Sequence, residues 1–210
     1  MRTIFRYGGV AASIVLIALG IGAIVVGISG RSTVNDNLKQ EAVVGTPDMT
    51  PAAIAREAQG AGLKNVSLPT CSVAGQTVNN GDRARCFAQY MRIHALEASG
   101  GLTYAQMPRY ATANGAGTND ETKALLRNGK PVDNPARQVW VTETAISTAL
   151  NTSYFAQSVA LFAIVMGAAL LLTGVGFLLL TTGLLAATGE ALHLRRAGHA
   201  SHGAAHPAAS

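Results

Sequence analysis

The sequence predicts a mainly α-helical membrane protein with two transmembrane helices, extended as antiparallel stalks, and a small, disulfide-bonded, mostly helical extracytoplasmic cap. Residues 8–29 and 158–187 are apolar runs that contain no charged side chain, and two cysteines lie between them. Each run can cross a bilayer, whose hydrocarbon core of about 30 Å needs roughly 20 residues of helix. Because lipid offers no partner to free backbone groups, both runs must be helical.

Arginines flank the outer ends of both runs, and cationic flanks are typical of the cytoplasmic side of a membrane. They are Arg2 and Arg6 before the first run, and Arg195 and Arg196 after the second. Both chain ends are therefore expected in the cytoplasm. The predicted organisation is a cytoplasmic N-terminus over residues 1–8, transmembrane helices over 9–29 and 158–188, an extracytoplasmic stalk and cap domain over 30–157, and a disordered cytoplasmic tail over 189–210.

A cleaved signal peptide is the alternative interpretation of the first run. A signal h-region spans roughly 7 to 15 residues and ends at a small-x-small cleavage site. This run is longer and ends in Gly27-Ile-Ser-Gly-Arg31, which matches such a site poorly. The sequence favours an uncleaved signal anchor.

The only two cysteines, Cys71 and Cys86, lie between the two runs. Thiols outside the cytoplasm commonly oxidise, which predicts one disulfide closing a loop of about 15 residues and contributing about 3 kcal/mol in the chain-entropy model. A pair of buried free thiols is the alternative. No thioredoxin-like C-x-x-C spacing is present.

The formal net charge of +5 does not indicate nucleic-acid binding. Part of it belongs to the arginines that flank the membrane, and the region between the runs is nearly balanced. The lipid bilayer is the predicted partner, with a further protein partner or a homo-oligomer in the membrane.

Local signals predict the elements between the runs. The first helix is expected to continue through residues 31–42, and Thr50-Pro51 predicts a capped helix through Gln59. Residues 72–78 suggest at most a short strand or hairpin. Asp82 is a plausible N-cap for an amphipathic helix through Ser99, and Asn119 or Asp120 for a short helix ending at Asn128-Gly129. Asn134-Pro135 predicts the start of a helix that runs into the second span.

Small residues recur at seven-residue intervals in both spans, namely Ser13, Gly20 and Gly27 in the first and Ala160, Gly167 and Gly174 in the second. Small residues let helix backbones approach closely in lipid, and a seven-residue repeat keeps them on one seam. We expect this helix-packing seam to hold the spans together. The alternative is that the repeat reflects only the Gly- and Ala-rich composition of membrane helices.

His94 and Glu97 are the one chemically suggestive pair outside the membrane. On the helix of residues 82–99 they are three residues apart and share one face, along with Cys86, Phe87, Tyr90, Met91, Ile93 and Ala98, while Arg85, Gln89, Arg92 and Ser99 occupy the other. We interpret them as a buried structural polar pair. No metal site or cofactor is predicted, and the tail histidines 193, 199, 202 and 206 are a weaker metal signal.

Residues 92–106, from Arg92-Ile-His-Ala-Leu-Glu97 to Gln106, resemble a family of small actinobacterial two-span membrane proteins commonly labelled aromatic ring-opening dioxygenase. Asn134-Pro-Ala-Arg137 and Leu38-Lys-Gln-Glu41 are also similar to segments of that family. The resemblance implies the two-span layout and a bacterial plasma membrane. The family's shorter members lack the Cys71–Cys86 insert and the loop of residues 111–130.

An extradiol ring-opening site needs iron held by two histidines and one carboxylate, and His94 is the single histidine between the spans. We therefore predict that the chain is not an enzyme. The expected function is a non-catalytic integral membrane protein of the bacterial cell envelope, an accessory or interaction module that presents an extracytoplasmic domain. The alternatives are a receptor or channel-like oligomer and, least favoured, a ring-opening dioxygenase.

Overall fold

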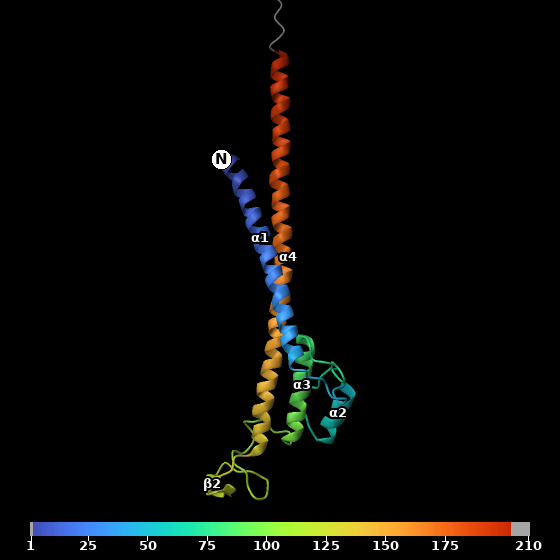
Figure 1. The fold of residues 1–210 in the computed structure, drawn as a ribbon, viewed down its shortest axis with the longest axis vertical. Coiled ribbons are helices and arrows are strands. Elements are labelled where there is room, and N and C mark those ends of the chain that lie inside the picture. Colours follow the sequence, from blue (N-terminus) through green and yellow to red (C-terminus); the bar gives the residue numbers. More distant parts are fainter. Residues whose placement is uncertain (1, 203–210) are drawn as a thin grey trace, which may run out of the picture. The chain divides into compact units, whose positions relative to one another are not determined.

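The computed structural model describes residues 2–202, with side chains described for residues 7–183. Its elements are α1 (Arg2–Gln40), α2 (Pro51–Gly60), α3 (Gly81–Ala98), a 3₁₀ turn (Glu121–Lys123), β1 (Leu126–Arg127), β2 (Lys130–Pro131) and α4 (Pro135–His202) (Figure 1). The prediction of a mainly helical chain with two long apolar helices is confirmed.

Two compact units divide the chain. The first combines α1 up to Ile28 with α4 from Leu161 onward, and the second comprises residues 29–160. The boundary between the units falls inside α1 and inside α4, so each long helix contributes to both.

The long helices are apolar without being buried. Residues Tyr7–Gln40 and Pro135–Gly183 are each long and apolar enough to cross a membrane. Only 17% of the most apolar window of the first, and 11% of that of the second, is buried. A core helix of a soluble protein would be mostly buried, which these two windows are not.

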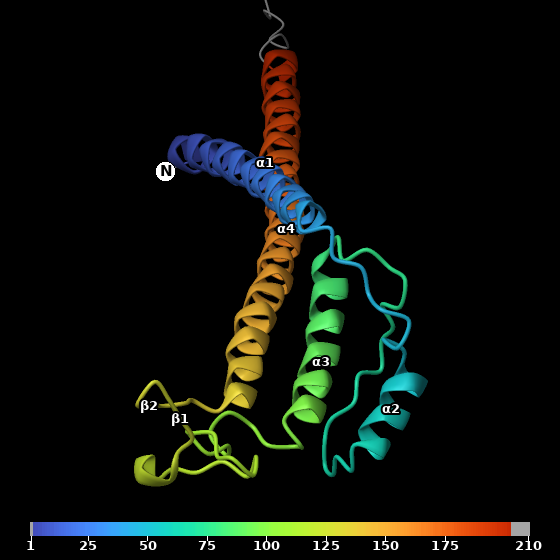
Figure 2. The same cartoon turned by 60° about the horizontal axis from the view of Figure 1, so that its bottom comes forward.

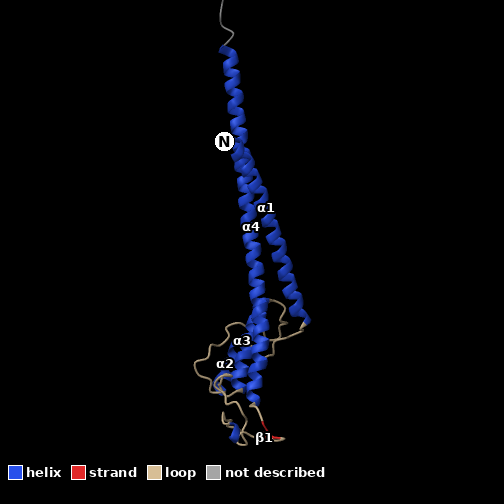
Figure 3. Ribbon diagram, turned by 90° about the vertical axis from the view of Figure 1, so that its left-hand side faces the viewer, coloured by secondary structure: helices blue, strands red, loops and turns tan. Residues whose placement is uncertain are grey.

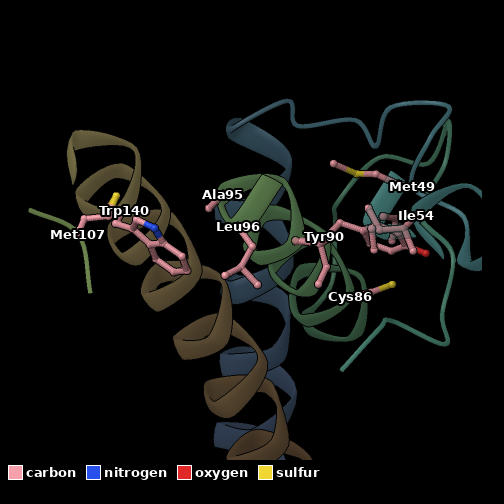
Figure 4. Packing of buried hydrophobic residues seen from close by; sticks show 11 residues of the cluster. Met49, Ile54, Cys86, Tyr90, Ala95, Leu96, Met107 and Trp140 are labelled. Atoms are coloured by element: carbon pink, nitrogen blue, oxygen red, sulfur yellow. The ribbon is translucent and has the colours of Figure 1, made fainter. Parts of the chain in front are cut away.

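The second unit has a packed interior centred on α3. Helix α2 lies beside α3 (Figure 2). Tyr90 and Ile54 are fully buried between these helices, and Trp140 of α4 closes the far side of the same cluster (Figure 4). A second cluster joins α1, α3 and α4 through Leu38, Val78, Ala84, Ala88 and Leu150.

The predicted disulfide is confirmed. Cys71 and Cys86 are bonded, with their Cα atoms 6.1 Å apart. The bond ties the loop after α2 to the buried face of α3. Tyr90, one turn further along α3, donates a hydrogen bond of 2.6 Å to the Cys71 carbonyl and so holds the same loop.

Two of the predicted helix starts are confirmed. The Thr50 side chain accepts from Ala53 N at 3.2 Å with Pro51 at the first helical position, and Asn134 accepts from Ala136 N at 3.1 Å before Pro135. The cap predicted at Asp82 is wrong. Asn80 caps α3 instead by accepting from Arg83 N at 3.0 Å, and Asp82 lies in the first turn, where a carboxylate also favours the helix.

The short helix predicted up to Asn128-Gly129 is also wrong in most of its length. Only Glu121–Lys123 forms a 3₁₀ turn, and the rest forms the antiparallel pair β1 and β2, drawn in red in Figure 3. Asn128 and Gly129 have φ of 52° and 71°. Two consecutive positive φ values define the tight hairpin turn that Asn-Gly favours, so this pair closes a hairpin rather than ending a helix.

Residues 72–78 agree with the expectation of at most a short strand, whereas the tail differs from expectation. Residues 72–78 form no strand and make only isolated bridges, Gly45 with Ala74 and Val44 with Thr77. The tail expected to be disordered from residue 189 is helical as far as His202. The flanking arginines and the tail histidines lie outside the residues whose side chains are described.

Candidate functional site

The close contacts of the first unit involve the predicted seam residues. A Cβ built on Gly20 would lie 2.7 Å from the Gly167 carbonyl oxygen, and one on Gly167 would lie 2.7 Å from that of Gly20. The two backbones therefore touch at this point and leave no room for a side chain. In a membrane such close approach is the main source of helix association.

The contact continues along both helices, with earlier residues of α1 facing later residues of α4. A Cβ on Gly174 would lie 2.8 Å from Ile17, and one on Gly9 would lie 2.9 Å from the Thr181 hydroxyl. Ser13 is fully buried between these points and donates to the Gly9 carbonyl at 2.8 Å. The seam prediction did not include Gly9, although Thr181 continues the repeat of the second span.

Gly27 and Ala160 fall in different units, so their predicted pairing stays a prediction. Within the second unit, Ala160 is 7% exposed, and its Cβ lies 3.7 Å from the position that a Cβ on Gly30 would take. Ala160 thus packs against α1 there.

His94 has other partners than the one predicted. Its Nε2 lies 3.0 Å from Asp48 Oδ2 and 3.6 Å from Glu57 Oε2, whereas Glu97 is exposed. The His94 and Glu97 pair is corrected accordingly. The helical spacing places both side chains near one face, but Asp48, just before α2, and Glu57, in α2, lie closest to the histidine.

Three segments bring this cluster together. Asp48 lies in the turn before α2, Glu57 in the last turns of α2, and His94 in the last turns of α3. The three donor atoms lie within 4.8 Å of one another, and each side chain is about one third exposed. A hydrogen bond from Thr46, with a smaller contribution from the charge of His94, keeps the pKa of Asp48 below its usual value.

The prediction for Ser99, which was based on the two faces of the helix, is also wrong. Expected on the polar side, it is 8% exposed. It caps α3, and Trp140 Nε1 donates to its hydroxyl at 3.1 Å and to the Leu102 carbonyl at 2.9 Å. A polar residue is buried here because the helix end and the indole satisfy it.

A polar groove of about 730 Å³ lies between α3 and α4 in the second unit. Arg85 stacks 4.7 Å from the ring centroid of Tyr154, and Arg92 lies 5.4 Å from that of Trp140. The α4 wall is rich in hydroxyl and amide groups: Thr144, Ser147, Thr148, Asn151 and Thr152.

Glu143, which lines the same groove, was missed at the sequence level. It is 5% exposed and accepts a hydrogen bond of 2.8 Å from Ser147. The signal was present, since Glu143 is the only charged side chain between Arg137 and Glu190. A lone charge in so apolar a stretch points to a specific environment.

No family model, curated protein or solved structure matches this chain.

Proposed function

We propose that the chain is a non-catalytic integral membrane protein of a bacterial cell envelope, an accessory or interaction module that presents residues 30–157 outside the cytoplasm. One observation carries the proposal. Two long helices expose large apolar side chains such as Val26, Phe162 and Leu172, which are 65% to 72% exposed. Water disfavours such a surface, whereas lipid is its natural solvent.

The contacts within the first unit support the same proposal. Helices in lipid gain little from burying apolar side chains against each other, so they associate where small residues let backbones touch. Gly20 and Gly167 make such a contact, while Gly22 and Gly176 face open space. In this proposal α1 and α4 cross the bilayer as a pair and continue outside it as antiparallel stalks that carry the α2 and α3 cap.

The disulfide and the flanking arginines support the orientation. A disulfide persists where the compartment is oxidising, which is the outer side of a bacterial plasma membrane. Arginines at residues 2, 6, 195 and 196 favour the cytoplasmic side for both chain ends.

A reductant that cannot cross membranes tests this orientation on the unmodified protein. Intact cells are treated with a charged phosphine and then with an impermeant maleimide, and lysed cells serve as the control. We expect Cys71 and Cys86 to label equally in both samples and only after reduction. Labelling that requires lysis, or thiols that label without reductant, would contradict the proposal.

The groove between α3 and α4 is the surface proposed for a partner. Its two arginines are held by aromatic rings, and its α4 wall offers hydroxyl and amide groups, which suits a polar, anionic surface segment of another protein. A photo-crosslinking residue at Thr148 should give a discrete adduct that Arg85→Glu and Arg92→Glu abolish.

The matched control carries the crosslinker at Lys123, an exposed position in the loop before β1. An adduct with the mass of two chains would identify a homo-oligomer, as a receptor or channel would form. Equal adducts from Thr148 and Lys123 would mean that the groove is not a binding surface.

A further inference from the structure

We infer that Asp48, Glu57 and His94 form a binding site for a divalent transition-metal cation, with zinc as the best fit. The site lies where α2 and the turn before it meet α3, and none of its three residues lines the groove that contains Arg85 and Arg92. The inference does not depend on the membrane placement proposed above.

The donor geometry matches a metal's coordination sphere. Zinc binds imidazole nitrogen and carboxylate oxygen at about 2.0 to 2.2 Å in tetrahedral geometry, so neighbouring ligand atoms stand roughly 3.3 to 3.6 Å apart. His94 Nε2 lies 3.0 Å from the Asp48 oxygen and 3.6 Å from the Glu57 oxygen, and all three atoms lie within 4.8 Å of one another. One cation could contact all three once side-chain rotation brings the Asp48 and Glu57 oxygens to this spacing.

His94 has too few hydrogens for the two carboxylates beside its Nε2 atom. Nε2 of an imidazole carries at most one hydrogen, so His94 can donate fully to only one of the two carboxylates that approach it. Among the described residues, the ion pairs of Asp48 and Glu57 run to His94 alone. A divalent cation would satisfy both carboxylates and the imidazole together.

The supports of the three ligands are rigid. The neighbours Met49 and Ile93 are each 2% exposed, and Ile54, one turn before Glu57, is fully buried. The Cys71–Cys86 bond and the Tyr90 hydrogen bond fix α3 to the loop that follows α2. Ligands held on packed elements lose little entropy when a metal binds.

The chemical types of the three ligands favour zinc. One imidazole and two carboxylates suit zinc better than calcium or magnesium, which prefer oxygen ligands alone. Each of the three side chains keeps about a third of its surface exposed, which leaves coordination positions open to water.

Zinc binding to the full-length protein in detergent micelles tests the inference. Equilibrium dialysis with metal analysis should find one more Zn²⁺ per wild-type chain than per Glu57→Gln chain. We expect Glu57→Gln, Asp48→Asn and His94→Ala each to weaken this site at least about tenfold, because even changes to groups behind a metal ligand cost about 10- to 100-fold. All variants keep the tail histidines, so any zinc bound there cancels.

Glu97→Gln is the matched control, since it removes an exposed carboxylate one turn further along α3 and should leave the affinity unchanged. Zinc should raise the Tm of the wild type and of Glu97→Gln but not of Glu57→Gln. Glu57→Gln preserves shape, so it carries the test if His94→Ala does not fold.

Equal zinc content and equal Tm shifts in the wild type and Glu57→Gln would overturn the inference. So would calcium or magnesium raising the Tm as much as zinc, because the imidazole would then not be a ligand.

Discussion

The two units of the chain are stabilised by different physical effects. In the first, Gly20 and Gly167 meet backbone to backbone while large apolar side chains face outward. In the second, Ile54, Tyr90 and Ile93 are buried around a disulfide. The first unit therefore depends on the absence of side chains at the helix contact, whereas the second depends on side-chain burial and a covalent bond. Each unit should fail under changes that spare the other.

The largest expected effect is loss of the disulfide. Cys71→Ser with Cys86→Ser should lower the free energy of unfolding of the second unit by about 2 to 5 kcal/mol, since the bond closes a loop of 15 residues. Hydrogen exchange would show faster exchange in α2 and α3 and unchanged exchange in α1 before Ile28. Equal acceleration in both regions would mean that the units do not fold separately.

A bulky residue at the glycine contact should affect the first unit instead. Gly20→Leu or Gly167→Leu forces the backbones apart and should cost about 1 to 3 kcal/mol of helix association. Gly22→Leu and Gly176→Leu are matched controls, because a Cβ at either position meets open space. Association can be measured as the efficiency of crosslinking between one cysteine on α1 and one on α4, both placed outside the glycine contact.

Ile24 is an apolar residue of α1, but it cannot serve as a control position outside the glycine contact. Its Cγ1 would lie 2.8 Å from a Cβ on Gly167, so it belongs to the contact. If Gly22→Leu weakened the crosslink as much as Gly20→Leu, the seven-residue repeat would be compositional only.

Gly81→Ala tests a close approach inside the second unit. An added Cβ would lie 2.8 Å from Tyr154 Cα, which cannot give way as a flexible side chain could. We expect a loss of about 1 to 3 kcal/mol in the free energy of unfolding, measured by denaturant titration. Gly60→Ala, in α2 with nothing within 4 Å of the new methyl group, should be neutral or stabilising.

Tyr90→Phe should give the smallest effect, about 1 kcal/mol from the lost hydrogen bond to Cys71. It should also change the alkaline behaviour. Burial, with a smaller contribution from the charge of Asp48, raises the pKa of Tyr90 above its ordinary value of 10.0. The unfolded chain thus ionises first, and the stability contributed by neutral Tyr90 is lost as pH rises from about 10 towards the folded-state pKa.

Denaturant titrations from about pH 8 to about pH 11 would show this difference, with a shallower alkaline decline in Tyr90→Phe than in the wild type. Identical slopes would mean that Tyr90 ionises equally in both states.

Sequence rules correctly predicted the features that depend on neighbouring residues alone. Thr50-Pro51 and Asn134-Pro135 start helices because capping depends on neighbours in sequence, and the apolar runs are helical because of their composition. The sequence also contained the Asn128-Gly129 hairpin signal, but the same dipeptide ends helices, and only the partner strand decides between the two.

The candidate metal site could not be predicted from one helix. Spacing placed Glu97 near His94, while Asp48 and Glu57 reach His94 through the packing of α2 on α3. That packing depends on the shapes of Ile54, Tyr90 and Ile93 and on the disulfide. Contacts between residues distant in sequence leave no periodic pattern, so neither the cluster nor the burial of Glu143 follows from periodicity alone.

The buried side chain of Gln157 joins three helices of the second unit. Its oxygen accepts from the Gly81 backbone N–H at the start of α3, and its nitrogen donates to Asn35 of α1 at 3.5 Å. A rotated amide would set nitrogen against N–H and oxygen against oxygen, so only one of its two orientations makes both bonds. Gln157 therefore helps to fix the relative positions of α1, α3 and α4 in the second unit. An axial slip of one long helix past the other, or a displaced start of α3, would lengthen or break its hydrogen bonds.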